Sequence, residues 1–121
     1  ASTLIGTYLN GADMAGAYLR EANLMGALLI GTDLNEADLA IANLSRANLG
    51  SANLYGAGLR GTNLAEAILS GADLRETDLT DAILYGANLS NANLKGATVS
   101  AQTLIGANLW GATLPNEEIR Q

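Results

Sequence analysis

The residues able to do chemistry are few and of few kinds. The chain of 121 residues holds 12 carboxylates and 6 basic side chains but neither Cys nor His. A disulfide framework, a thiol nucleophile and a Cys/His zinc site are therefore excluded. No Gly-rich phosphate loop follows a strand, and no nucleophile is placed beside a base. The sequence predicts a non-catalytic protein with no cofactor and no metal site.

Charge and hydropathy exclude two further classes. The net charge is -6, and no basic patch is present that would follow a phosphate backbone, so direct nucleic-acid binding is not expected. No apolar run approaches the ~20 residues that span a bilayer, and no signal peptide is visible, so we expect no membrane insertion by this segment. The chain begins at Ala1 without Met, and we interpret it as processed or excised from a longer protein.

The elements that position these residues follow a period of five. From Leu4 onward every fifth residue is Leu except at Met14, Val99 and Ile119, and the residue two before it is Ala or Thr except at Ser2, Gln102 and Glu117. In a helix this period advances about 140° per repeat, and in a strand it alternates faces, so neither gives a stripe of leucines. The chain must turn once in each five-residue word, and the words must stack on each other as a solenoid.

The turn residues come in two kinds. The second residue after Leu is Gly in half of the words, which favours a type II turn because its third residue has a positive φ. We predict type I turns where this residue is not Gly, because β-branched Ile41 in particular disfavours positive φ. These positions are Glu21, Glu36, Ile41, Arg46, Glu66, Glu76, Asp81 and Ala101.

These words resemble the pentapeptide-repeat family, whose motif is A-(D/N)-L-X-X. Clear examples are Ala12-Asp13-Met14, Ala22-Asn23-Leu24, Ala37-Asp38-Leu39, Ala47-Asn48-Leu49, Ala72-Asp73-Leu74 and Ala107-Asn108-Leu109. The resemblance implies an all-β fold, a right-handed quadrilateral parallel β-helix with four words per coil. Leu and the residue two before it would point inward. We expect roughly six coils and a rod of about 30 Å, with mixed type II and type I turns.

Departures from the motif predict where the array is irregular. Gln102 is too large for an interior slot, so we expect a local distortion with its amide turned outward. Residues 2–114 are predicted to form the β-helix and 115–121 a C-terminal cap or tail, with Pro115 opening a short turn or helix and Ile119 covering the last leucines. The N-terminus offers no comparable cap, so residues before Ala1 or another molecule would cover that edge.

With four words per coil, residues 20 apart share a column, and charge is distributed unequally among the columns. The column through Leu9 carries no charged outward residue, and it is a candidate interaction face through Tyr8, Leu28, Ile30, Ile68 and Trp110. Scattered apolar residues are also ordinary on such surfaces. The next two columns hold nearly all the acid. Asp13 and Asp33 would stack there about 5 Å apart, repelling unless backbone N–H groups satisfy them.

Two functions follow. We expect a non-catalytic scaffold or protein-interaction module, binding a protein partner or a second copy. The resemblance is to a family numerous in cyanobacteria, with some members attached to membrane-anchored proteins. A cytoplasmic segment, tethered to a membrane through a missing N-terminal part, is the corresponding expectation. The alternative is a DNA-mimic inhibitor or protector of DNA gyrase, a type II topoisomerase, as in the quinolone-resistance members. B-DNA carries a charge per ~1.7 Å, or about 17 over such a rod, far more than a net -6.

Overall fold

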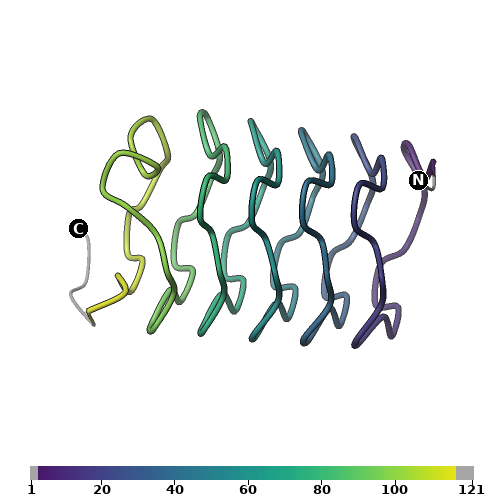
Figure 1. Cartoon of the computed structure of the whole chain (residues 1–121), viewed down its shortest axis with the longest axis horizontal. Helices are drawn as coiled ribbons and strands as arrows, with labels where there is room; N and C mark the ends of the chain where they lie inside the picture. Colours follow the sequence, from purple (N-terminus) through teal and green to yellow (C-terminus); the bar gives the residue numbers. More distant parts are fainter. Residues whose placement is uncertain (1–2, 117–121) are drawn as a thin grey trace.

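The chain winds into a rod of stacked four-sided coils with its ends at opposite ends of the rod (Figure 1). The computed structural model describes residues 3–116. Within them the regular structure consists of single-residue parallel bridges and turns, without a helix or a longer strand. Each bridge joins residues 20 apart, and four bridges fall within each 20 residues. The first four are Thr3↔Asn23, Tyr8↔Leu28, Asp13↔Asp33 and Tyr18↔Asp38. We call the columns that begin with these bridges sides 1 to 4, in that order.

The repeat unit provides an acceptor for every backbone N–H group. In the word Asn43–Ala47 the five N–H groups donate, in chain order, to Ala22 O (2.9 Å), Asn63 O (2.7 Å), Asn43 Oδ1 (3.0 Å), Ala65 O (3.0 Å) and Leu44 O (3.0 Å). Three of these bonds join neighbouring coils, one closes the corner turn, and one is made to a side chain. The Asn or Asp of the motif therefore accepts the one N–H that no backbone carbonyl takes, which is why a polar residue precedes Leu.

The prediction of mixed turns is wrong, because the corners on both kinds of residue are type II. Glu21, Glu36, Ile41, Arg46, Glu66, Glu76 and Asp81 have φ between +59° and +63°, close to the glycines. A type I turn would place this residue near -90°. The reason is the ladder: Ile41 N–H donates to Arg60 O at 2.9 Å, as Gly61 N–H donates to Thr80 O at 2.8 Å. Cross-coil hydrogen bonds thus impose one corner geometry and override a local preference of about 1–2 kcal/mol.

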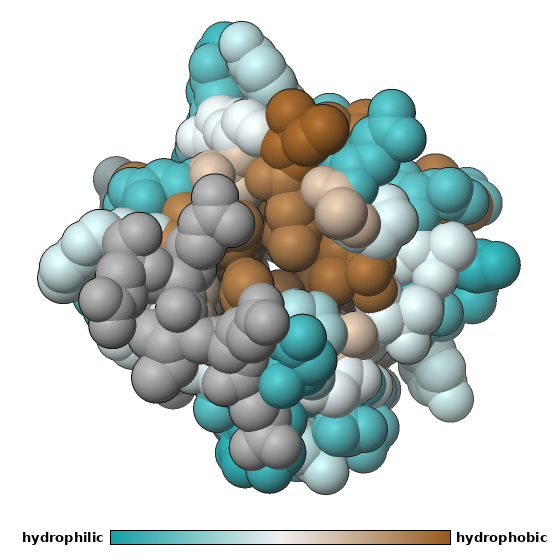
Figure 2. Space-filling model, turned by 90° about the vertical axis from the view of Figure 1, so that its left-hand side faces the viewer, coloured by the Kyte–Doolittle hydropathy of each residue, from teal (hydrophilic) through white to brown (hydrophobic). Residues whose placement is uncertain are grey.

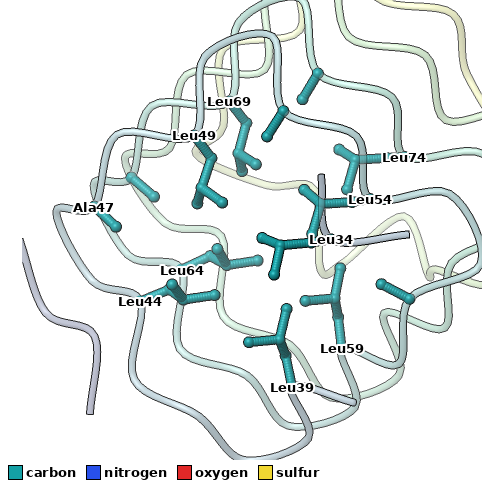
Figure 3. Packing of buried hydrophobic residues seen from close by; sticks show 14 of the residues in the cluster. Leu34, Leu39, Leu44, Ala47, Leu49, Leu54, Leu59, Leu64, Leu69 and Leu74 are labelled. Carbon is teal, nitrogen blue, oxygen red and sulfur yellow. The ribbon is translucent and has the colours of Figure 1, made fainter. Parts of the chain in front are cut away.

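The core consists of the inward Leu and Ala side chains, as the repeat predicts. Leu44 and Leu64, one coil apart, are at most 1 % exposed, and Figure 3 shows the leucines of successive coils pointing into the middle of the rod. Each buried Leu contributes about 1.5–3 kcal/mol. Thr62 takes an Ala position, and its buried hydroxyl donates to Leu39 O at 2.7 Å, the carbonyl partner that a buried hydroxyl needs.

The array is interrupted once within residues 3–116, at the predicted position. The bridges run to Asp78↔Thr98 and resume at Asn88↔Asn108, while Ile83 pairs with Asn63 alone. Between them, the N–H groups of 103, 104 and 105 donate three residues back, to the carbonyls of 100, 101 and 102. Gln102 is exposed, which confirms the outward amide. Of the predicted cap at 115–121, residues 117–121, including Ile119, lie outside the described residues. The carbonyl of Pro115 still accepts from Gly96 N–H at 3.1 Å.

Candidate interaction face

Side 2 and the corner that follows it form one uncharged surface along the rod, which we call the charge-free face. Its outward residues are Tyr8, Asn10, Leu28, Ile30, Asn48, Gly50, Ile68, Ser70, Asn88, Ser90, Asn108 and Trp110. Consecutive bridges from Tyr8↔Leu28 to Asn88↔Asn108 place the side 2 residues in one continuous column. No charged side chain of the described residues lies on it.

The structure brings together three of the five predicted contact residues and separates the other two. Tyr8, Leu28 and Ile30 are neighbours near the N-terminal end of the rod, where Tyr8 is 84 % exposed and Leu28 is half-buried. Ile68 lies two coils from Leu28 with Asn48 between them. Trp110, 63 % exposed, lies near the C-terminal end. The face therefore has apolar contacts at both ends and a mostly polar middle.

Three of the four asparagines of this face, Asn48, Asn88 and Asn108, have their acceptors occupied by their own turns. Asn48 Oδ1 accepts from Gly50 N–H at 3.0 Å, and Asn108 Oδ1 accepts from Trp110 N–H at 3.1 Å. An unpaired buried acceptor costs about 1–3 kcal/mol. A partner that covers these asparagines does not incur this cost for their side-chain oxygens, because those oxygens are already hydrogen-bonded. The second bond also fixes the backbone that carries Trp110.

Asn10 has a role that the sequence reasoning missed. Leu28 occupies a motif position without a side-chain acceptor, so the N–H of Ile30 lacks its usual partner. Asn10 Oδ1, from the preceding coil, accepts this N–H at 2.8 Å. The signal was present in the sequence, because an Asn stands 20 residues before the residue whose own word lacks Asn or Asp.

The net charge of the described residues lies on the other half of the rod. Sides 3 and 4 and the corners that follow them carry nine of the ten described carboxylates and four of the five described cations. The carboxylates there are Asp13, Glu21, Asp33, Glu36, Asp38, Asp73, Glu76, Asp78 and Asp81, and the cations are Arg20, Arg60, Arg75 and Lys95. The remaining pair, Arg46 and Glu66, lies at the corner between sides 1 and 2 and is joined by a 3.1 Å ion pair. One half is thus neutral and the other net negative.

Local contacts tune two carboxyls on the charged half. Arg75 donates to both oxygens of Asp73, at 2.9 and 2.7 Å, and lies over the ring of Tyr55 at 5.2 Å. This hydrogen bond is the main cause that lowers the pKa of Asp73. Hydrogen bonds from the Thr80 hydroxyl and N–H lower the pKa of Asp78.

Asp13 and Asp33 form a turn-stabilising pair. They are bridge partners one coil apart, as predicted, and each accepts a backbone N–H: Ala15 to Asp13 at 3.2 Å and Asn35 to Asp33 at 3.0 Å. These bonds stabilise the carboxylates against mutual repulsion. In residues 3–116 no group of three or more carboxylates is placed to hold a metal ion. Over the same range no helix is long and apolar enough to cross a membrane.

A second apolar cluster was not predicted. Ile83, Tyr85 and Ile105 are 48 %, 71 % and 70 % exposed on side 1 and its corner, near the break. Tyr85 covers Gly106, where an added Cβ would lie 2.9 Å from its ring. Figure 2, which looks at the C-terminal end, shows hydrophobic surface gathered near its middle with polar groups around it. Apolar residues at outward positions 20 apart, Tyr85 and Ile105, were the signal available in the sequence.

These features define a β-helical repeat protein with a core of inward Leu and Ala side chains and with its charged side chains at outward positions. The chain belongs to the pentapeptide repeat family: the model described as "Pentapeptide repeats" matches eight copies over residues 2–39, 42–81 and 82–116. Proteins of this family form right-handed quadrilateral β-helices and are generally non-catalytic structural or interaction proteins. No curated protein sequence matches the chain.

Several solved structures are similar to the chain. HetL, a pentapeptide repeat protein involved in heterocyst differentiation regulation from the cyanobacterium Nostoc sp. strain PCC 7120, is 33% identical. That alignment covers 98% of this chain and 72% of HetL, with a TM-score of 0.54. The protein alr5209 from Nostoc PCC 7120 is 29% identical over 84% of this chain and 83% of its own, with a TM-score of 0.72. QnrB1, a plasmid-mediated fluoroquinolone resistance protein, is 20% identical over 90% and 60%, with a TM-score of 0.58. At that identity QnrB1 supports the fold alone.

Proposed function

We propose that this chain is a non-catalytic interaction module that binds protein through its charge-free face. The observation that carries the proposal is the separation of charge, which leaves a continuous uncharged surface along the whole rod. Four of the eleven exposed large hydrophobic side chains of the described residues, Tyr8, Ile30, Ile68 and Trp110, lie on this face. Four more lie on side 1 and its corner, next to the face: Ile5, Ile83, Tyr85 and Ile105. Aromatic side chains and depletion of charge are the compositional marks of an interface core.

The rigidity of the array supports a scaffold role. The backbone that carries each outward side chain is held between a core Leu and a hydrogen-bonded corner, so the backbone of the face is ordered before a partner binds. Binding then costs little backbone entropy. The two ends of the face, at Tyr8 and Trp110, would provide the anchors. Attachment of the module to a membrane through a longer parent stays a prediction.

The test compares matched baits. The chain, the variant Tyr8→Ser/Trp110→Ser and the control Tyr18→Ser/Tyr55→Ser are immobilised and exposed to extract of the cells that make the protein. Tyr18, 92 % exposed, and Tyr55 lie on the charged half, so the control removes two aromatic rings from the wrong surface. We expect a partner retained by wild type and control but lost from the first variant. Equal retention by all three baits would contradict the proposal.

A further inference from the structure

The charge-free face has a midpoint about which its two ends can be exchanged. Bridges lead from Tyr8 to Asn108 in five steps of one coil, about 24 Å in all. Their middle lies between Asn48 and Ile68. A two-fold axis placed there, in the plane of the face and perpendicular to the rod, exchanges the two ends. We propose, as a more specific form of the proposed function, that the partner is a second copy of this chain, docked antiparallel through this face.

The axis places the large apolar residues of the face opposite polar residues of the partner, and it brings the two exposed aromatic residues close together at each end. The axis brings the end that carries Trp110 onto the partner's end that carries Tyr8 and Asn10. Trp110 and Asn10 share one corner column, and Tyr8 stands beside Asn10. The axis keeps that column opposite itself, so the indole of Trp110 lies over the partner's Asn10, beside the ring of the partner's Tyr8. The two exposed aromatic side chains would thus be neighbours once at each end of the dimer.

Among residues 3–116, the two charged side chains on the neutral half obey the same symmetry. Arg46 and Glu66 occupy one corner column, one coil apart, on either side of the same midpoint. The axis therefore places Arg46 of each copy opposite the partner's Glu66, forming a cluster of two cations and two carboxylates. A parallel docking would place Arg46 opposite the uncharged corner instead. Charge complementarity thus selects the antiparallel arrangement.

Long-range charge favours the same contact. Two copies that each carry net -6 repel when their charged halves approach. When the two copies dock through their neutral halves, their charged halves stay on the outside of the dimer. The charged halves are then separated by more than the Debye length of about 8–10 Å. A face about 29 Å long, with a five-residue word reaching at most about 17 Å across, covers at most roughly 500 Å² per copy, below the size of most specific interfaces. We therefore expect a weak dimer.

Sedimentation equilibrium of the full chain from about 10 µM to about 1 mM tests the contact. Wild type is expected to pass from monomer to dimer over this range, and Trp110→Ser to weaken dimerisation at least about tenfold. Arg46→Glu and Glu66→Arg each place like charges across the axis, so each alone is expected to stay monomeric. A mixture of these two variants pairs opposite charges at both positions, and we expect it to form the heterodimer.

The control and the contrary outcomes are distinct. Arg20→Glu reverses a charge in an ion pair on the charged half, where Arg20 lies 3.1 Å from Asp38, and should dimerise like wild type. Circular dichroism verifies that each variant is folded. A wild-type monomer at about 1 mM, or a mixture that stays monomeric while wild type dimerises, overturns the antiparallel dimer. Neither result bears on binding of a different protein, which the bait comparison tests separately.

Discussion

Replacing Asn10 by Ala should destabilise the rod only because Leu28 lacks a side-chain acceptor. In wild type, Asn10 Oδ1 accepts the Ile30 N–H at 2.8 Å. In Leu28→Asn, position 28 should supply that acceptor locally, as Asn48 does for Gly50 at 3.0 Å. The two positions therefore form a double-mutant cycle with a predictable sign.

The magnitude follows from the hydrogen bond and its exposure. A net intramolecular hydrogen bond is worth about 0.5–1.5 kcal/mol, and water can partly replace this one because Ile30 is 44 % exposed. We expect Asn10→Ala to cost about 0.5–1 kcal/mol in wild type and close to zero in Leu28→Asn. Leu28→Asn alone loses half-buried apolar surface, but that loss cancels in the cycle.

The assay is urea unfolding, monitored by circular dichroism, of wild type, Asn10→Ala, Leu28→Asn and the double variant. Asn88→Ala is the matched control, because it removes the acceptor of Ser90 N–H at 3.0 Å within one word. Asn88→Ala should lower the free energy of unfolding by an amount similar to Asn10→Ala in wild type, and this amount should be the same with Leu or Asn at position 28. An equal cost of Asn10→Ala in both backgrounds would refute the assignment of Asn10 as the substitute acceptor.

Three further predictions concern the corners, the acidic half and the alternative function. Ile41→Gly should stabilise the chain by about 0.5–1 kcal/mol, since removing left-handed strain outweighs the extra chain entropy of Gly, and a lower unfolding midpoint would contradict the corner assignment. Asp78 has a lowered pKa in the folded chain, so its stabilisation is present above the unfolded value of about 3.9 and is lost as pH falls through the folded value. Asp78→Asn should therefore flatten the decline in stability below about pH 4, and Thr80→Val should raise the pKa of Asp78 in an NMR titration; an unchanged pKa removes the stated cause. DNA gyrase should supercoil at full rate in a large excess of this protein, because net -6 is far below the charge of about 17 on a matching DNA length, and inhibition would favour the DNA-mimic alternative.

The sequence predicted the features that depend on periodicity and failed where neighbouring coils decide. Leu44 and Ala47 are buried because a five-residue word repeats the same inward positions, and this was readable from the spacing alone. The size of Gln102 similarly located the break. The turn type predicted at Ile41 was wrong, because the prediction considered the backbone preference of isoleucine and not the hydrogen bond from Ile41 N–H to Arg60 O in the next coil. Asn10 was missed because its acceptor serves the next coil rather than its own word.

The candidate face was predictable only in part, for the same physical reason. Column membership of Tyr8 and Trp110 followed from the 20-residue repeat that the family resemblance implied. Which of the outward residues lie next to each other did not follow from the repeat, because the motif says nothing about contacts between outward side chains. Tyr85 was overlooked although it covers Gly106, since its column also holds Ser45 and Ala65, which hide an apolar cluster at one end. Contacts between outward residues depend on the path of the backbone at each corner.

The most direct test of the central claim compares two adjacent residues in the middle of the rod. Leu54 is 1 % exposed and points inward, whereas Asn53 is half-buried with its oxygen on Tyr55 N–H at 3.0 Å. Thermal unfolding should show Asn53→Asp melting only a few degrees below wild type, since a carboxylate keeps that bond although its bridge partners one coil away on either side are Asp33 and Asp73. Leu54→Asp should be unfolded, because it buries an unpaired charge among the leucines. Cooperative unfolding of Leu54→Asp near the wild-type temperature would contradict the inward and outward assignment from which every face described above derives.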